Sequence, residues 1–454
     1  MLRFGIALPP IAPWLSRFNA PRGSVKEGGI LSCRLHIRSF IFLLSASCAA
    51  GSAIAESMLP DPLKLIDVTA IALGSRPEVL VAKARAEAAA QRPNIVSALE
   101  DPMISASIDH YPYNNPMMEG GRRYNKSFAI EQKFPLSRVR AHRADAARAE
   151  ADRAKALVAG TELDVVLDAQ RSFFMLYERR RMKGVIEEQI SLARQLVSAA
   201  ASRYSSGSGV QADVLRAEVE VARLRAEQQS LAAQIRAAEV MLNVSLGRSE
   251  QEAIPALQYK PNREEPGPDA NVLDQAFSNR PELAAGVAEV AKSKADLEVM
   301  RTMYKPMAMI RIGEASTMAE GRGAMFMIGV SVPLWRERLD AGVTEAQAMQ
   351  RMADADLDSM RRMVAGEVLA GREKVNAVRT QLRALESEVL PRALIAVDSS
   401  LAGYASGKGS LVAAIESARA LWSVQAELIM AESALGEAWV RLDRAIGKAQ
   451  ENKQ

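Results

Sequence analysis

The sequence predicts a mainly α-helical fold with a small β part, in which each chain contributes four strands to a transmembrane barrel that is shared between copies. Three observations support this prediction. The 454 residues form two similar halves, each half joins two alternating segments to very long Ala-rich helices, and an export signal precedes both halves. A sheet of four strands with one apolar face cannot close on itself, so the chain is expected to assemble with copies of itself.

The duplication is clearest in two matching segments, RYSSGSGVQADVL at 203–215 and GYASGKGSLVAAI at 403–415. They align without a gap as far as Gly247 and Gly447, with ten identities in 44 positions. Upstream, Arg76-Pro77-Glu78 matches Arg280-Pro281-Glu282. Each half therefore has the order helix, strand, strand, long helix, tip and long helix, as expected for a duplicated unit.

The composition favours helices in side-by-side contact and argues against two common classes of protein. Aromatic residues make up 5% of the chain and charged residues 25%, with both signs interspersed and a net charge of +4. No basic patch with interleaved aromatic residues is present, which argues against nucleic-acid binding. Three histidines, with no nucleophile elbow, phosphate loop or metal-ligand pair, argue against an enzyme.

Residues 1–55 are predicted to be a leader. Arg34 and Arg38 precede an apolar segment that ends in Ala53-Ile54-Ala55, a small-x-small cleavage site. The apolar segment is too short to span a bilayer comfortably, although an uncleaved anchor is the alternative. Both cysteines, Cys33 and Cys48, lie in this leader, so cleavage leaves neither disulfides nor thiolate metal sites. Lipidation of Cys48 is a further alternative, without the usual aliphatic residue three positions earlier.

After the leader we expect a first repeat at 56–247, a linking segment at 248–275, a second repeat at 276–448 and a tail at 449–454. The helix at 61–99 restarts at Arg76-Pro77-Glu78, because Pro is tolerated in the first turn. Long helices follow over 137–203 and 336–403, the second interrupted mainly at Pro391. Some 65 helical residues reach about 100 Å. The returning helix 210–246 has coiled-coil spacing. Its seam is Val214, Ala217, Val221, Leu224, Gln228, Leu231, Ile235, Ala238 and Leu242.

Four segments alternate between apolar and polar residues and are predicted to be strands: 103–109, 126–134, 307–313 and 325–332. Loops are expected between the members of each pair, at 110–125 and 314–324. In an exported protein, such strands are typical of a barrel wall with lipid outside and water inside. Three copies would give twelve strands and two copies eight; we favour three, although the sequence does not count subunits.

Taken together, these features resemble the TolC family of outer-membrane efflux proteins. The resemblance covers essentially all of residues 60–448 and depends on the two Arg-Pro-Glu motifs, the strand-to-helix joints at Pro135 and Pro333, and both Tyr-x-x-Gly tips. The phrase AIEQKFPLSRVRAHRADAARAEADRA is most similar to the heavy-metal subgroup, the CusC- and CzcC-like outer-membrane factors.

The resemblance implies a homotrimer in the outer membrane of a Gram-negative bacterium, with a twelve-stranded barrel and a helical cylinder that crosses the periplasm. It implies a passive duct without a cofactor, whose tips contact a periplasmic adaptor bound to an inner-membrane pump of the RND type. Heavy-metal cations are the expected cargo. Export of drugs or small organic molecules, or type I secretion of proteins, is the alternative, and a non-conducting trimeric coiled-coil adhesin or structural protein is an alternative of another class.

The candidate site residues lie at the two tips, 204–210 and 404–410. Gly207, Gly209, Gly407 and Gly409 allow tight turns and close approach of an adaptor, or simply cap helices.

For the entrance, the resemblance implies links between neighbouring helices and rings of acidic side chains. Asp213 and Tyr404 match one such link. A second is in doubt, because Gly409 replaces the family's arginine, with Lys408 beside it. Of the family's two inward aspartates one is Ala413 here and the other is Glu416, which would attract cations in a threefold ring.

No metal site is predicted. Met103, His110, Met117 and Met118 lie in or beside the first outer loop, and thioethers prefer soft ions. Methionine is also ordinary apolar filling, and no compact cluster with ligand spacing is visible in the sequence.

Overall fold

The computed structural model describes residues 59–109, 124–317 and 320–448. The predicted leader, the predicted tail and most of the first predicted loop lie outside these residues. The first half contains β1 (Leu63–Lys64), α2 (Leu65–Ser75), α3 (Pro77–Ser97), β2 (Met103–Asp109), β3 (Asn125–Pro135), α4 (Val139–Ser205) and α5 (Gln211–Ser245). The second contains β4 (Leu257–Gln258), α6 (Asp269–Asn279), α7 (Pro281–Thr302), β5 (Met307–Thr317), β6 (Gly321–Ser331), α8 (Arg336–Ala384), the π-helical segment η1 (Leu385–Val389), α9 (Leu390–Ala405) and α10 (Leu411–Ile446).

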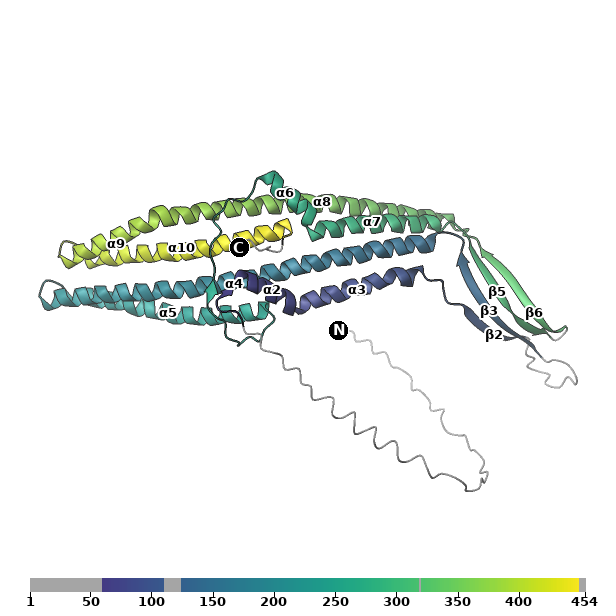
Figure 1. Cartoon of the computed structure of the whole chain (residues 1–454), viewed down its shortest axis with the longest axis horizontal. Coiled ribbons are helices and arrows are strands. Elements are labelled where there is room, and N and C mark those ends of the chain that lie inside the picture. Colours follow the sequence, from purple (N-terminus) through teal and green to yellow (C-terminus); the bar gives the residue numbers. More distant parts are fainter. Residues whose placement is uncertain (1–58, 110–123, 318–319, 449–454) are drawn as a thin grey trace, which may run out of the picture. The chain divides into compact units, whose positions relative to one another are not determined.

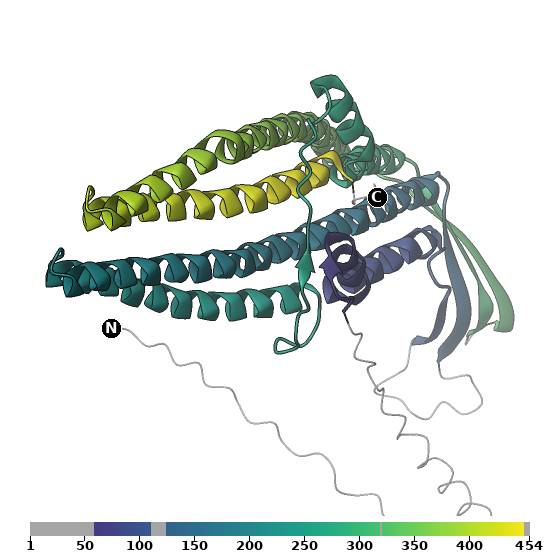
Figure 2. The ribbon, with the colours of Figure 1, turned by 60° about the vertical axis from the view of Figure 1, so that its left-hand side comes forward.

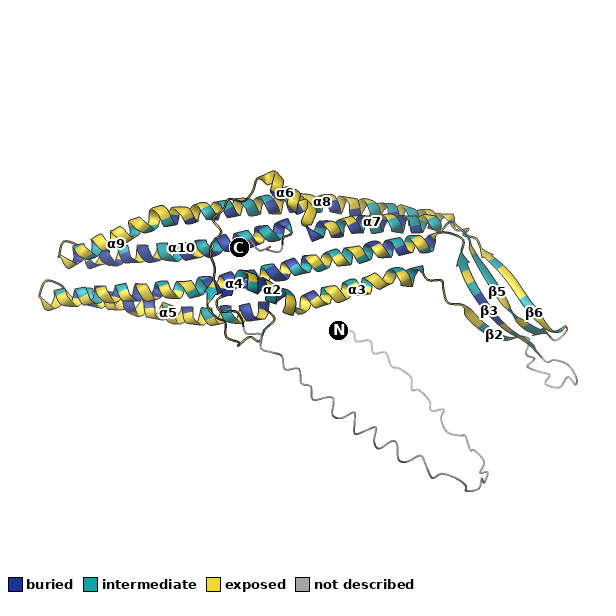
Figure 3. Cartoon of the chain, viewed as in Figure 1, coloured by how far each residue is buried: buried dark blue, intermediate teal, exposed yellow. Residues whose placement is uncertain are grey.

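The long helices lie side by side, with the sheet at one end and the two tips at the other (Figures 1 and 2). Helix α4 is central and packs against α3, α5, α7 and α10. The apolar core accordingly runs along the helices as a series of clusters, and buried residues follow their facing sides (Figure 3). All nine seam positions predicted for α5 are buried or half-buried, which confirms the heptad spacing.

The interruption predicted at Pro391 is present as the π-helical segment η1, which ends two residues before the proline. Pro391 has no N–H to donate to the carbonyl four residues earlier, at Ser387, and its ring crowds that turn. A π-helical turn, whose hydrogen bonds span five residues instead of four, accommodates this change without ending the helix. Helices α8 and α9 therefore continue one another.

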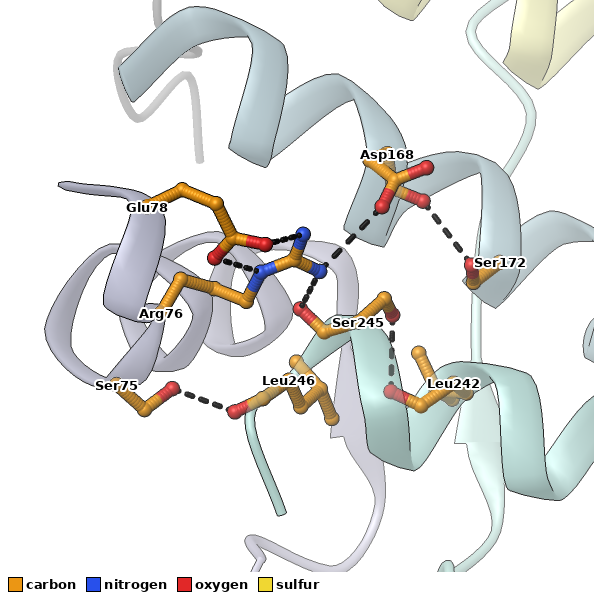
Figure 4. A network of polar contacts seen from close by, with 8 residues as sticks. All are labelled: Ser75, Arg76, Glu78, Asp168, Ser172, Leu242, Ser245 and Leu246. Atoms are coloured by element: carbon orange, nitrogen blue, oxygen red, sulfur yellow. Dashed lines mark hydrogen bonds and ion pairs between the residues drawn. The ribbon is translucent and has the colours of Figure 1, made fainter. Parts of the chain in front are cut away.

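The two Arg-Pro-Glu motifs make equivalent contacts in the two halves. Arg76 donates to the Glu78 carboxylate through Nε (2.9 Å) and to the Ser245 carbonyl at the end of α5 (3.2 Å), as Figure 4 shows. Arg280 donates in the same way to Glu282 (3.0 Å) and to the Ala445 carbonyl at the end of α10 (3.1 Å). A cation at a helix C-terminus satisfies free carbonyls and favours the helix dipole. The motif therefore joins the start of each half to the end of its returning helix.

The linking segment packs on the helices. Strand β4 pairs in parallel with β1, and the Tyr259 ring meets Phe174 edge to face with centroids 4.8 Å apart. The Trp439 indole donates to the Asn262 carbonyl (3.0 Å). Helix α6 begins at Asp269, inside the stretch 248–275 that was predicted to link the two halves.

The four long strands form one antiparallel sheet in the order β2-β3-β5-β6. The predicted second loop at 314–324 is wrong, because β5 and β6 stay paired from Glu314↔Ala324 to Thr317↔Gly321. The sequence there is small and polar rather than alternating, but backbone hydrogen bonding extends the ladder regardless of side chain. Strands β2 and β6 are the edges of this sheet and have no strand partner on their outer sides within the described residues.

One face of the sheet is apolar and exposed. Its large side chains are between 48% and 65% exposed in the single chain, far more than a water-facing sheet would leave. Register places them in rows across the strands, as in Ile104↔Ile130↔Ile312↔Phe326. They are Ile104, Ile108, Phe128, Ile130, Ile312, Phe326, Ile328 and Val330. Among the helices that the structure describes, none is long and apolar enough to cross a membrane.

Candidate functional site at the helical tips

The two tips are similar helix–turn–helix connections at the end of the molecule opposite the sheet (Figure 1). Gly207 (φ 73°) and Gly407 (φ 77°) end the incoming helices in the left-handed region, which favours glycine. At Gly209 and Gly409 an added Cβ would lie 3.1 Å from backbone or Cβ atoms of the preceding helix. All four glycines thus have a conformational reason within the chain, and contact with an adaptor stays a prediction.

Arg203 joins the two tips to each other. Its Nη1 donates to the Tyr404 carbonyl (2.8 Å), and its guanidinium lies 4.7 Å from the centroid of the Tyr404 ring. A second donor, Nη2, reaches the Ser208 carbonyl (3.1 Å). Arg203 therefore places a positive charge between the tips, held by a cation–π contact and charge-assisted hydrogen bonds. The arginine that the resemblance implies is Gly409 in this chain.

Tyr404 is buried and lies near Asp213 across the space between α9 and α5. Burial raises the pKa of the Tyr404 phenol, and the negative charge of Asp213 raises this pKa further. The hydroxyl has no hydrogen bond of normal geometry among the described residues. The Asp213 carboxylate also lies 3.7 Å from Arg216 on its own helix.

A second connection, which the sequence analysis missed, lies about two turns farther from the tips. Arg419 of α10 binds the Glu220 carboxylate of α5 through both Nε (2.9 Å) and Nη2. The Glu220 side chain is only 3% exposed, whereas Arg419 is about half exposed. Arg223, one turn along α5, approaches the same carboxylate at 3.3 Å. We call the Glu220–Arg419 pair the inter-helix link.

The inter-helix link is ionised at neutral pH. The hydrogen bond from Arg419 lowers the pKa of Glu220 below its ordinary value of 4.5, outweighing the opposing effect of burial. A carboxylate whose pKa is lower in the folded state contributes stability above its ordinary pKa and loses it as the pH falls through the folded value. Acidification toward pH 4.5 therefore leaves the link in place, and only a lower pH breaks it.

The other two predicted residues do not take part in these connections. Lys408 is exposed, and among the described residues only its backbone N–H is bonded, to the Gly403 carbonyl (2.9 Å). Glu416 is exposed in a surface groove of about 350 Å³ between α5 and α10, where Glu220 and Arg419 also lie. A carboxylate in this position can attract cations without forming a fixed contact of its own.

The residues that sequence reasoning missed are Arg203, Glu220 and Arg419. These residues could have been found because they are not repeated in the other half. The positions equivalent to them there are Gly403, Ala420 and Val219. A charged residue in only one of two equivalent helices suits a contact between the halves. Its partner could not be read from the sequence, because Glu220 and Arg419 are 199 positions apart.

The described residues contain no group of three or more His, Cys, Asp and Glu side chains able to hold a metal ion. Of the residues considered in the sequence for soft ions, Met103 lies in β2. His110, Met117 and Met118 lie outside the described residues.

Comparison with known proteins gives a consistent result. A family model described as outer membrane efflux protein matches residues 68–248 and 272–448. The cobalt-zinc-cadmium resistance protein CzcC of Cupriavidus metallidurans is 24% identical over 361 residues, covering 78% of this chain and 85% of CzcC. A solved structure of CusC has a TM-score of 0.75 at 15% identity, covering 85% and 92% of the two chains. The outer-membrane channel OprN has a TM-score of 0.74 at 17% identity, covering 84% and 89%. Both structural likenesses concern the fold.

Proposed function

Because this chain belongs to the outer membrane efflux protein family, we propose that it is the passive exit duct of a three-part efflux system for heavy-metal cations. The family is one of outer-membrane channels, and no catalytic step is assigned to this chain. The observation that carries the proposal is the exposed apolar face of the sheet, rows of Ile, Phe and Val that suit contact with lipid.

A trimer is supported by the number of strands and the two free edges. Four strands per chain are too few for a closed barrel, since known barrels begin at about eight. Edges β2 and β6 each offer unpaired backbone groups to a neighbouring copy. Three copies would supply twelve strands. The long helices would then extend the duct away from the membrane on the side of the tips.

The partners proposed are a periplasmic adaptor at the tips and an inner-membrane pump of the RND type. The two tips expose several residues around Gly207, Gly209, Gly407 and Gly409. A duct without an energy source of its own requires a pump, which would also select the cargo.

Heavy-metal cations are supported by the likeness to CzcC, whose name assigns it to cobalt, zinc and cadmium resistance. Deleting the gene should lower the concentrations of these cations that the cells tolerate, and a plasmid copy should restore tolerance. Growth on cobalt, zinc, cadmium, copper and several antibiotics measures this. If the deletion strain is sensitive to antibiotics alone, drug export is indicated instead of metal export. If the deletion strain fails to secrete a protein, the secretion alternative is favoured.

Cation preference at the entrance is expected to depend on Glu416. We expect Glu416→Gln to lower the cation-to-anion permeability ratio, because three carboxylates around a narrow mouth concentrate cations. Reversal potentials in salt gradients across planar bilayers measure the ratio. Lys408→Gln, which removes a charge of opposite sign at the same end of the molecule, should not lower it. An unchanged ratio in Glu416→Gln would contradict the role of Glu416.

A further inference from the structure

Three polar residues form a row across the apolar face of the sheet, at the end of the strands farthest from the helices (Figure 1). Lys126 of β3 pairs with Ser316 of β5, and Ser316 pairs with Arg322 of β6. Each lies an even number of positions from an apolar-face residue of its own strand, as Lys126 does from Phe128, so all three share that face. We call Lys126, Ser316 and Arg322 the basic row.

The basic row carries positive charge that its own face does not fully neutralise. Among the described strand residues of this face, the charged side chains are Lys126, Glu314 and Arg322. Arg322 donates to Glu314 through Nε, which leaves its terminal N–H groups for a second acceptor. Lys126 has no ion pair within the described residues, and its ammonium lies 4.7 Å from the centroid of the Tyr124 ring. Glu320 lies beyond the ladder, in the turn that joins β5 to β6. Two cations against one carboxylate therefore leave one positive charge per copy on this face.

The position of the basic row corresponds to the edge of an apolar membrane core. Phe326 occupies the middle of the five rows on this face, and Arg322 lies two rows away on the same strand. Two rows are four residues, or about 14 Å along a strand, which becomes about 10 Å of height when the strand is tilted by about 40°. The apolar band of an outer-membrane barrel is about 25 Å tall, so the basic row lies just inside its edge and its long side chains reach the headgroups beyond. Trp335, 77% exposed just before α8, lies at the opposite end, where an aromatic residue suits the inner interface.

The groups that the basic row offers are those that proteins use to bind phosphate. The ammonium of Lys126 and the guanidinium of Arg322 are charged donors, and the Ser316 hydroxyl lies between them. The outer two residues are two strand spacings apart, about 10 Å at the backbone, which their long side chains can close around one phosphate group.

Because the helices of this outer-membrane family extend into the periplasm, the far end of the sheet lies in the outer leaflet. That leaflet consists of lipopolysaccharide, whose lipid A part carries phosphate groups on a sugar backbone and acyl chains below it. We propose that Lys126, Ser316 and Arg322 bind a phosphate group of lipid A, with its acyl chains lying along the apolar rows of the same face. This inference rests on the proposed function for the barrel wall, and it assigns to that wall a lipid ligand that the duct does not transport.

The test measures lipid A binding to the detergent-purified mature protein. Native mass spectrometry during a titration with bisphosphorylated lipid A gives the apparent affinity. We expect the wild type to bind dephosphorylated lipid A about tenfold more weakly, because charge-assisted hydrogen bonds to the phosphate are lost. Lys126→Gln should lower the affinity for the phosphorylated lipid about fivefold, the effect of one cation beside an anionic lipid. Lys126→Arg should retain most of it.

Lys133→Gln is the matched control. It removes the same charge from the same strand, but the exposed Lys133 lies an odd number of positions from Lys126 and therefore on the other face. We expect its affinity for lipid A to equal that of the wild type. An excess of inorganic phosphate should not displace the lipid, because a free anion lacks the acyl chains.

The outcomes separate this inference from the proposed function. Equal affinity for the two forms of lipid A, an equal loss in Lys126→Gln and Lys133→Gln, or displacement by inorganic phosphate overturns the lipid site. Potassium conductance of the same preparations in planar bilayers is measured without lipid A. A conducting wild type that does not distinguish the two lipids overturns this inference alone. A wild type that never conducts overturns the proposed function, and this inference with it.

Discussion

Phe326→Lys is expected to remove most of the protein from the outer membrane. Phe326 lies in the middle of β6 on the apolar face, 64% exposed in the single chain. A Lys that faces lipid near the bilayer midplane costs about 2–4 kcal/mol, and a trimer carries that cost three times. The fraction of protein recovered as assembled oligomer in outer-membrane preparations measures the effect.

Met327→Lys is the matched control, because it places the same charge one residue along the same strand. Met327 lies on the opposite face of the sheet, where a barrel interior would let a lysine remain in water. We expect this variant to assemble nearly as well as the wild type. Equal loss of both variants would indicate that the two faces do not differ in environment, contrary to a barrel wall.

Breaking the inter-helix link is expected to favour a wider entrance. Arg419→Gln leaves Glu220 without its partner on α10, and therefore removes the ion pair between α5 and α10 in every copy. A hydrogen bond to a charged group contributes roughly 1.5–3 kcal/mol, which corresponds to about a tenfold or larger shift in an opening equilibrium. Single-channel conductance and open time in planar bilayers measure this shift.

Arg223→Gln is the control for this experiment. Arg223 approaches the same Glu220 carboxylate but belongs to the same helix, so its loss should leave the helices joined. Exchange of the charges in Glu220→Arg/Arg419→Glu should restore part of the wild-type behaviour. The difference between wild type and Arg419→Gln should persist from about pH 7.5 to about 5.5, because the pKa of Glu220 is lowered. Disappearance of the difference within that range would show that the carboxylate is not held ionised by Arg419.

Much of the fold could be predicted because it depends on local periodicity. The seam of α5 follows steps of three and four, and the strands β2 and β3 follow steps of two, so both were predicted within about two residues. The repeat likewise identified both Arg-Pro-Glu motifs and both tips. The positions of Gly207 and Gly407 followed from the same comparison, since a left-handed turn favours glycine in either half.

By itself the sequence therefore determined the duplicated order of elements, the helix lengths, the alternation of the strands and the family. Tertiary structure alone decided the contacts between the halves. The contact of Arg203 with Tyr404 and the inter-helix link both depend on how separate segments are aligned in space. The periodicity of the sequence carries no information about that alignment. It is set by packing between the helices, which brings together positions that are far apart in the chain, such as 220 and 419.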